Sequence, residues 1–266
     1  MSGSIRITAG TEVVALSTPT QPRPTGLALV TVPDGLSGFE VQHHLDEAWG
    51  HPAQWAGEHR PPVEMQLDLR TKGPGPRAQV NELLDILRYP VSVVVTSPEL
   101  GDRWVAARKR QVSNIIWHGG SAVNAKYATF SVILTIPDPV WESEPEWVEK
   151  TTAPWGWIDL PTTGEQAFWP RITITGTHNG VAIRLTADDT PQSLPYDPRG
   201  WVVETEPSRP GISTVTGAHD YTGYVPFWAT PVEPLSGLAQ VEIIPTNPGT
   251  NFKVRVEWTP RSDRAW

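Results

Sequence analysis

Three groups of polar residues have the composition of a catalytic or metal site. The first is a histidine-rich segment, residues 42–60, that contains His43, His44, His51 and His59. Imidazole nitrogens suit zinc or iron, but a helical pair of metal ligands is four residues apart. The gaps between these histidines are 1, 7 and 8 residues. We therefore interpret the segment as a polar, tryptophan-containing surface loop and predict no metal site.

Paired carboxylates form the second group. A glycosidase needs two carboxyl groups about 5–10 Å apart across a sugar-binding cleft. Three sets qualify by number alone: Asp188/Asp189, Glu204/Glu206 and Glu142/Glu144/Glu146. Solvated turn and strand positions explain each set more simply. The chain also lacks the G-x-S-x-G, P-loop, G-x-G-x-x-G and H-E-x-x-H motifs and has no cysteine. We predict that it is not an enzyme and uses no cofactor.

The third group is the basic run Arg108-Lys109-Arg110. Consecutive side chains of a strand point to opposite faces, so this run does not form a patch for nucleic acid. The loop Gly73-Pro74-Gly75 precedes an expected helix but lacks the further glycines and the lysine of a phosphate-binding loop. We interpret it as a connection between a strand and a helix.

Composition excludes two further classes. The 266 residues carry 21 basic and 29 acidic side chains, a net charge of −8, and this balance argues against a nucleic-acid-binding module. No apolar run reaches the 18 or so residues of a membrane span. We therefore expect no membrane insertion.

Tryptophan is the unusual residue of this composition, because 13 are present against 5 phenylalanines and 5 tyrosines. Its ring buries a large area and is enriched at interaction hot spots, and its apolar face can stack on a sugar. We expect three of them to be core residues: Trp169, Trp201 and Trp258. The candidates for an interface or for glycan stacking are Trp141, Trp147, Trp155, Trp157 and Trp228.

Alternation of apolar and polar residues predicts a mainly β protein. A period of two, typical of half-buried strands, is present in residues 63–70, 130–136, 181–185 and 252–259. The more continuous apolar run Val91–Thr96 predicts an interior strand.

One helix is predicted, over about residues 76–88, because Val80, Leu83, Leu84 and Leu87 form a single apolar stripe. The acidic and proline-rich stretch 137–156 predicts a domain boundary. We expect one β domain over 1–148 and a second, a β-sandwich, over 149–266.

Several segments carry a family resemblance through their order and spacing. They are Val32-Pro33-Asp34-Gly35-Leu36, Leu83-Leu84-Asp85-Ile86-Leu87, Pro137-Asp138-Pro139-Val140-Trp141, the run 169–177 and the closing run 251–266. Together they resemble the distal tail protein (Dit-like) family of long-tailed phages, over nearly the whole chain. The closing run is similar to the ends of minor tail proteins of actinobacterial phages.

The resemblance implies an N-terminal split β-barrel-like domain with one helix and a C-terminal galectin-like β-sandwich. It implies a homo-hexameric ring at the distal end of the virion tail that joins the tail tube to the tip or baseplate. The implied partners are the tail tube protein, the tape measure protein and tip, hub or receptor-binding proteins. DNA would only pass through the bore, and the family has no catalytic residues to carry over.

Two alternatives stay open. The expected sandwich and the candidates Trp155, Trp157 and Trp228 also fit a carbohydrate-binding module that recognises host cell-wall glycans. The paired carboxylates leave a glycoside hydrolase with an accessory domain as a third interpretation.

Overall fold

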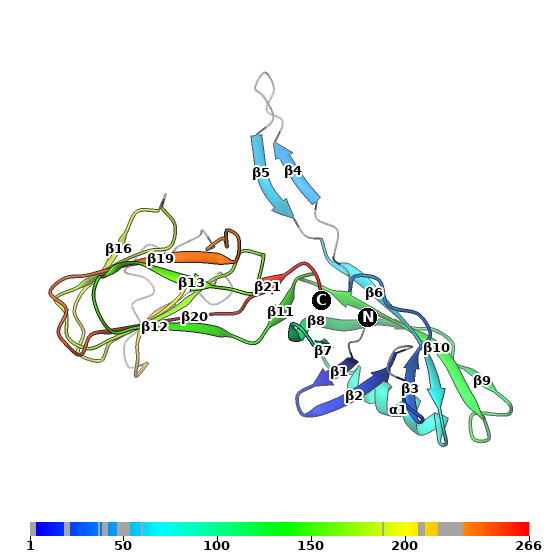
Figure 1. The fold of residues 1–266 in the computed structure, drawn as a ribbon. Helices are drawn as coiled ribbons and strands as arrows, with labels where there is room; N and C mark the ends of the chain where they lie inside the picture. Colours follow the sequence, from blue (N-terminus) through cyan, green and yellow to red (C-terminus); the bar gives the residue numbers. More distant parts are fainter. Residues whose placement is uncertain are drawn as a thin grey trace. The chain divides into compact units, whose positions relative to one another are not determined.

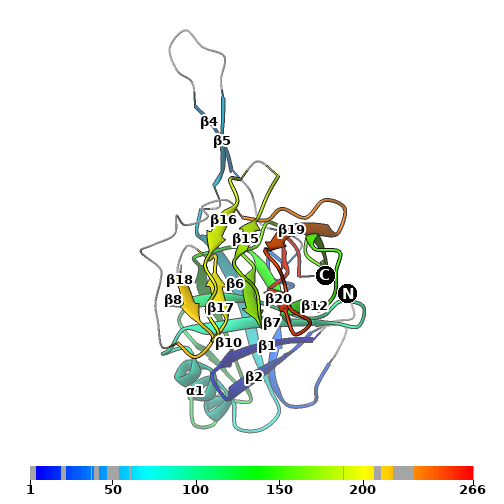
Figure 2. The same cartoon turned by 90° about the vertical axis from the view of Figure 1, so that its left-hand side faces the viewer.

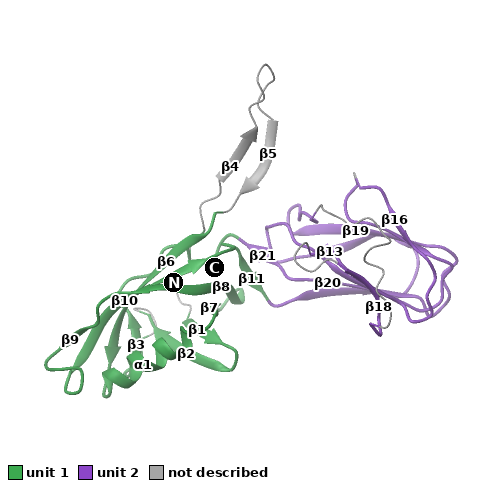
Figure 3. Cartoon of the chain, turned by 180° about the vertical axis from the view of Figure 1, so that it is seen from behind, with its two compact units in different colours: residues 1–143, 263–266 green, residues 144–262 purple. Residues whose placement is uncertain are grey.

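The chain folds into two units in this computed structural model (Figure 3). Unit 1 contains residues 1–143 and 263–266, and unit 2 contains residues 144–262, whereas the sequence predicted a division after residue 148. The structure describes residues 4–18, 22–36, 38, 42–46, 54–59, 61–187, 189–206, 211–217 and 231–265, with only the backbone described in 42–46 and 54–59.

The main sheet of unit 1 closes into a barrel (Figure 1). Its elements are β1 (Ser4–Ala9), β2 (Glu12–Ser17), β3 (Gly26–Leu29), β6 (Val63–Lys72), α1 (Pro76–Ile86), β7 (Val91–Ser97), β8 (Gly101–Val112), β9 (Ile116–His118), β10 (Tyr127–Ile136) and β11 (Trp141–Ser143). Hydrogen-bonded neighbours follow the order β11-β8-β7-β1-β2-β3-β6-β10-β9. Pairing of β8 with β10 closes the ring of strands, and β2 and β3 form its one parallel pair among the described strands. The mainly β, barrel-like prediction is confirmed.

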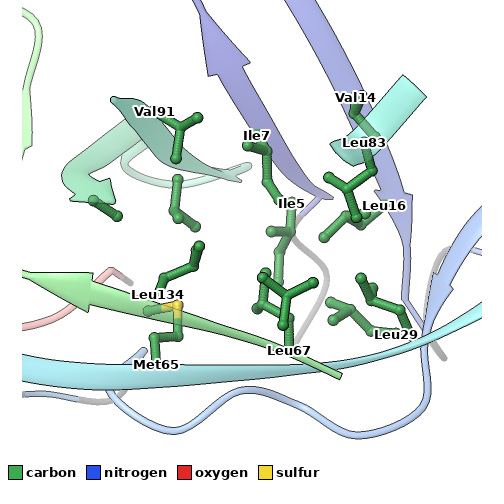
Figure 4. Close-up of a cluster of buried hydrophobic side chains, with 14 of the residues drawn as sticks. Ile5, Ile7, Val14, Leu16, Leu29, Met65, Leu67, Leu83, Val91 and Leu134 are labelled. Atoms are coloured by element: carbon green, nitrogen blue, oxygen red, sulfur yellow. The ribbon is translucent and has the colours of Figure 1, made fainter. Parts of the chain in front are cut away.

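Alternating side chains fill the interior of this barrel. Along β10 every second residue from Ala128 to Ile136 is buried, and along β6 the buried residues include Met65 and Leu67. Figure 4 shows Ile5 of β1 pointing toward Leu67 from the opposite side of the core. Burial of each such aliphatic side chain stabilises the fold by about 1.5–3 kcal/mol. The strands predicted over 63–70, 91–96 and 130–136 are therefore confirmed.

Helix α1 begins at Pro76, a residue suited to the first helical turn because its missing N–H has no intrahelical acceptor there. It buries Val80, Leu83 and Ile86 and lies against β2, β3, β6 and β10. The helix ends two residues before the predicted limit; Leu84 of the predicted stripe packs partly buried against the core, and Ile86, outside that stripe, is fully buried. Within the described residues, no helix is long and apolar enough to cross a membrane.

The described parts of the histidine-rich segment form an antiparallel pair of strands, which corrects the prediction of a loop. Strand β4 (Gln42–Asp46) pairs antiparallel with β5 (Gln54–His59), and the register shifts between His44 and Leu45. The side chains of His43, His44 and His59, and all of His51, lie outside the described parts of the chain.

Unit 2 contains two sheets. Their strands are β12 (Glu146–Lys150), β13 (Gly156–Pro161), β14 (Arg171–Thr175), β15 (Val181–Arg184), β16 (Gln192–Leu194), β17 (Trp201–Glu204), β18 (Gly211–Thr214), β19 (Leu238–Pro245) and β20 (Lys253–Trp258), and the two-residue strand β21 (Arg261–Ser262) belongs to neither sheet. The first sheet has the order β12-β20-β14-β17-β18, and the second has the order β13-β19-β15-β16. Figure 2 shows β17 and β18 side by side at the edge of the first sheet.

The two sheets share one core, which makes unit 2 a β-sandwich. Ile174 and Val254 of the first sheet and Ile183 and Val241 of the second belong to the same buried cluster. Strands predicted over 181–185 and 252–259 lie in this core, and the predicted core residues Trp201 and Trp258 are buried there. The sandwich is thus confirmed, and its galectin-like character stays a prediction.

Candidate interaction site

Four of the five tryptophans predicted to act at an interface lie in the described parts of the chain, and their surroundings differ. Trp141 is fully buried in the core of unit 1, and its indole N–H donates to the carbonyl of Gly35 at 3.3 Å. Its ring therefore has no face left for a sugar or a neighbouring subunit. This corrects the prediction for Trp141, because pairing of β11 with β8 carries the residue into the barrel core.

Trp155 is half-buried against the core of unit 2. Its ring meets that of Phe252 edge to face, with 4.8 Å between centroids, and the ammonium of Lys150 lies 5.9 Å from its centroid. These contacts give Trp155 a packing role. Trp228 lies outside the described residues.

Trp147 and Trp157 are the exposed members, at 56 % and 36 %. They lie on different sheets, Trp147 on β12 and Trp157 on β13. Each ring has a guanidinium over it, since Arg255 Cζ lies 4.5 Å from the Trp147 centroid and Arg184 Cζ lies 5.1 Å from the Trp157 centroid. Both rings therefore contact a guanidinium, but of the two only Trp157 lines the groove described below.

Trp157 begins a row of outward side chains that crosses three strands of the second sheet. It lies opposite Glu242 on β19, and Glu242 lies opposite Arg184 on β15. Arg184 donates from Nε to Glu242 Oε2 at 2.7 Å, and its Nη2 lies 2.5 Å from the same oxygen. Both side chains of this pair are largely shielded from solvent. A charge-assisted contact of this kind fixes the guanidinium over the Trp157 ring.

A groove of about 790 Å³ lies beside this row and within unit 2. The side chains that line it include Trp157, Asp189, Glu233, Leu235, Leu238 and Gln240. No lysine, arginine or histidine is among its described lining residues. Its volume lies inside the range of about 300–1,000 Å³ that is usual for small-molecule sites.

A tight turn presents the two leucines of the groove. The backbone N–H and C=O groups of Leu235 and Leu238 bond each other at 2.7 and 3.2 Å. Ser236 and Gly237 between them have φ values of 55° and 79°, as a two-residue type I′ turn requires. Thr162 donates to the carbonyl of Gly237 at 3.0 Å, which ties the turn to the end of β13. Leu235 is 82 % exposed.

Polar groups of the groove are also held in place. Gln240 donates from Nε2 to Asp159 Oδ1 at 2.7 Å, and both are outward residues of paired strands. Asp189 accepts a 3.1 Å hydrogen bond from the Thr186 N–H through Oδ2. The lone pairs on their other oxygens can accept from hydroxyl groups.

Several of the carboxylates considered for catalysis have structural partners. Glu204 lies 2.6 Å from Arg171 Nε, and Glu146 accepts from the Trp258 indole N–H at 3.1 Å. Asp188, the neighbour of Asp189, lies outside the described residues. Among the residues that the structure describes, no group of three or more potential ligands could hold a metal ion.

Sequence patterns pointed to Trp157 and to Asp189 but missed Glu233, Leu235, Leu238 and Gln240. One sequence feature could have located part of the groove: Ser236-Gly237 is a turn dipeptide with a leucine on each side of it. Residues on the two sides of such a turn lie opposite each other on one face, which could have marked the two leucines as a pair.

A seven-stranded barrel with one helix, followed by a two-sheet sandwich, places the chain among two-unit β proteins. The Dit protein of phage SPP1, a hub of the adsorption apparatus in phages that infect Gram-positive bacteria, has a similar structure. The TM-score is 0.61 at 15 % identity, and the match covers 88 % of this chain and 93 % of that one. A chain of the phage P2 baseplate in its activated, Ca-containing conformation has a TM-score of 0.50 at 9 % identity, over 99 % of this chain and 100 % of that one.

No protein-family model and no curated protein sequence matches the chain. The likeness to solved structures shows the fold, and this fold is the Dit-like one that the order of the segments predicted.

Proposed function

We propose that the chain is a structural protein of a phage tail tip. Six copies form a ring at the distal end of the virion tail, where it joins the tail tube to the tip or baseplate and carries host-recognition components. The observation that supports this most strongly is the match to the SPP1 Dit hub over nearly the full length of both chains.

Exposed apolar residues of unit 1 supply candidate ring contacts. Ile116 and Val123, 57 % and 75 % exposed, lie on and beside β9, the terminal strand of the main sheet. Val30 and Val32, also exposed, follow β3. A cyclic ring needs two different patches that meet head to tail, and an edge strand offers unpaired backbone groups. We assign these two pairs to opposite sides of the subunit contact.

The proposed partners are the tail tube, tape measure and tip or receptor-binding proteins, none of which requires a catalytic group. Each copy carries a net charge of −8. If acidic side chains line the bore, DNA is repelled from the wall and passes through without being bound.

Mass measurement in solution tests the ring. We expect a species of six times the 29.3 kDa chain mass, either alone or after addition of the tail tube protein. Ile116→Asp and Val123→Asp should reduce it to monomers, and the matched control Val215→Asp, on an exposed position of unit 2, should not. A strictly monomeric chain, with and without the tube protein, would contradict the proposal.

A further inference from the structure

We infer that the groove beside Trp157 is a binding site for a neutral oligosaccharide. The inference concerns unit 2 alone and does not depend on a ring of unit 1. It rests on the shape of the groove, on the mixture of apolar and polar groups that line it, and on its charge.

The large apolar groups of the groove are exposed. Trp157, Leu235 and Leu238 all line the groove, and all three are exposed although they are large and apolar. Exposed apolar groups gathered in one hollow mark an interaction site more often than scattered ones do. A pyranose ring presents a face of C–H groups, and this face can cover an exposed aromatic ring or aliphatic side chain.

The polar groups suit the hydroxyls of the same ligand. Gln240 offers both an amide N–H and a carbonyl, and Asp189 and Glu233 offer carboxylate oxygens. A sugar hydroxyl both donates and accepts, so it can bond to each of these groups. A few placed polar groups in a mainly apolar hollow are typical of small-ligand sites.

Charge selects a neutral sugar over an anionic one. Two carboxylates and no basic side chain line the described groove, so a phosphate-rich or carboxylated polymer would be repelled. A cationic ligand is disfavoured for a different reason. The guanidinium of Arg184 already lies over the Trp157 ring, so a cation–π position at this ring is already occupied.

Rigidity favours binding because less freedom is lost. The Arg184–Glu242 pair holds a guanidinium over the Trp157 ring, and the turn at Ser236-Gly237 fixes the backbone of the two leucines. A ligand that enters the groove therefore orders few side chains, which lowers the entropic cost of binding.

Titration calorimetry of the full chain tests the inference. The probes are neutral hexasaccharides of glucose, galactose and N-acetylglucosamine, together with poly(glycerol phosphate) and a lysine hexapeptide. We expect at least one neutral hexasaccharide to bind, with no binding of the phosphate polymer or the peptide. Trp157→Ala should weaken that binding about tenfold or more, which is about 1.4 kcal/mol.

Trp147→Ala is the matched control. Trp147 is also an exposed tryptophan with an arginine over its ring, but it does not line the groove. It should leave the affinity within about twofold. Leu235→Ser, at a position too exposed to disturb folding, should weaken binding and so covers the case in which Trp157→Ala misfolds. The inference is overturned if no neutral hexasaccharide binds, if Trp147→Ala weakens binding as much as Trp157→Ala, or if the anionic or cationic probe is the one that binds. If the chain forms the hexamer but binds no sugar, the sugar-binding inference fails while the tail-tip proposal stands.

Discussion

The guanidinium of Arg103 donates a 2.7 Å hydrogen bond to the backbone carbonyl of Arg264, 161 residues further along the chain. Next to it, Ala265 is fully buried in the unit 1 core, and its N–H donates to the Leu36 carbonyl at 3.0 Å. Unit 2 is therefore an insertion between β11 and the last residues of unit 1. Unit 1 is complete only when the C-terminus has returned to it.

Arg103→Met should destabilise unit 1 by about 1–3 kcal/mol, because the variant removes the charged donor of a partly buried hydrogen bond. Arg103 itself is buried. The control is Arg88→Met, which removes an exposed pair with Asp85 and should cost less than about 1 kcal/mol. Urea unfolding of both variants measures the difference, and equal losses would show that the contact with Arg264 contributes nothing special.

Thr71→Val should destabilise the barrel by about 1–3 kcal/mol. The buried Thr71 hydroxyl accepts the backbone N–H of Ala128 at 2.7 Å. Valine has nearly the same shape, but it leaves that N–H buried without an acceptor. Thr71→Ser keeps the hydroxyl and should retain most of the stability in chemical denaturation. The explanation fails if the valine variant is as stable as the serine variant.

Gly176→Ala should destabilise unit 2 strongly. Gly176 has a φ of 88°, and a Cβ there would lie 2.1 Å from the carbonyl oxygen of Asn251. The backbone must move, at about 1–3 kcal/mol beyond the strain of positive φ. Gly10→Ala is the control, since its φ is 59° and nothing lies within 4 Å of the added atom. We expect a clearly larger fall in Tm for Gly176→Ala, and similar falls would contradict the steric explanation.

The stability of unit 2 should depend on pH through His178. Burial lowers the pKa of His178 below its ordinary value of 6.5. Its Nδ1 accepts the Gly180 N–H at 3.0 Å, which requires that nitrogen to be unprotonated. The folded state therefore keeps a neutral imidazole at a pH where the unfolded chain already binds the proton. The free energy of unfolding should thus fall as the pH drops below 6.5.

Urea unfolding at about pH 7.5 and about pH 5.5 measures this dependence. In His178→Phe the difference between the two pH values should shrink. Phenylalanine retains the ring that packs edge to face against Tyr196 and Phe252, each with 5.4 Å between centroids. An unchanged difference in the variant would assign the pH dependence to other groups.

Local patterns predicted the elements well where one face of an element is buried. The alternation around Leu67 and Leu134 and the stripe through Val80 and Leu83 are set by local geometry, so they are visible in the sequence. These local patterns do not predict which strand pairs with which. No local pattern distinguishes Trp141 from the exposed Trp147. Trp141 is buried because β11 pairs with β8.

The groove and the packing of residues 263–265 on unit 1 could not be predicted from the sequence, because both depend on long-range contacts. Trp157, Glu242 and Arg184 share one row only through the register of three strands. Arg264 and Ala265 follow no apolar period, and their place is decided by contacts with Arg103 and Leu36 far away in the chain. Long-range pairing decides both, and a local pattern carries no record of it.

The central claim is that the chain is part of a phage tail tip, and the most direct test is to label it on intact virions. Gold-labelled antibodies against the chain, viewed by electron microscopy, should bind at the distal end of the tail. Binding at the head or along the tail shaft would contradict the claim. So would the absence of binding at the tip in particles that mass spectrometry shows to contain the chain.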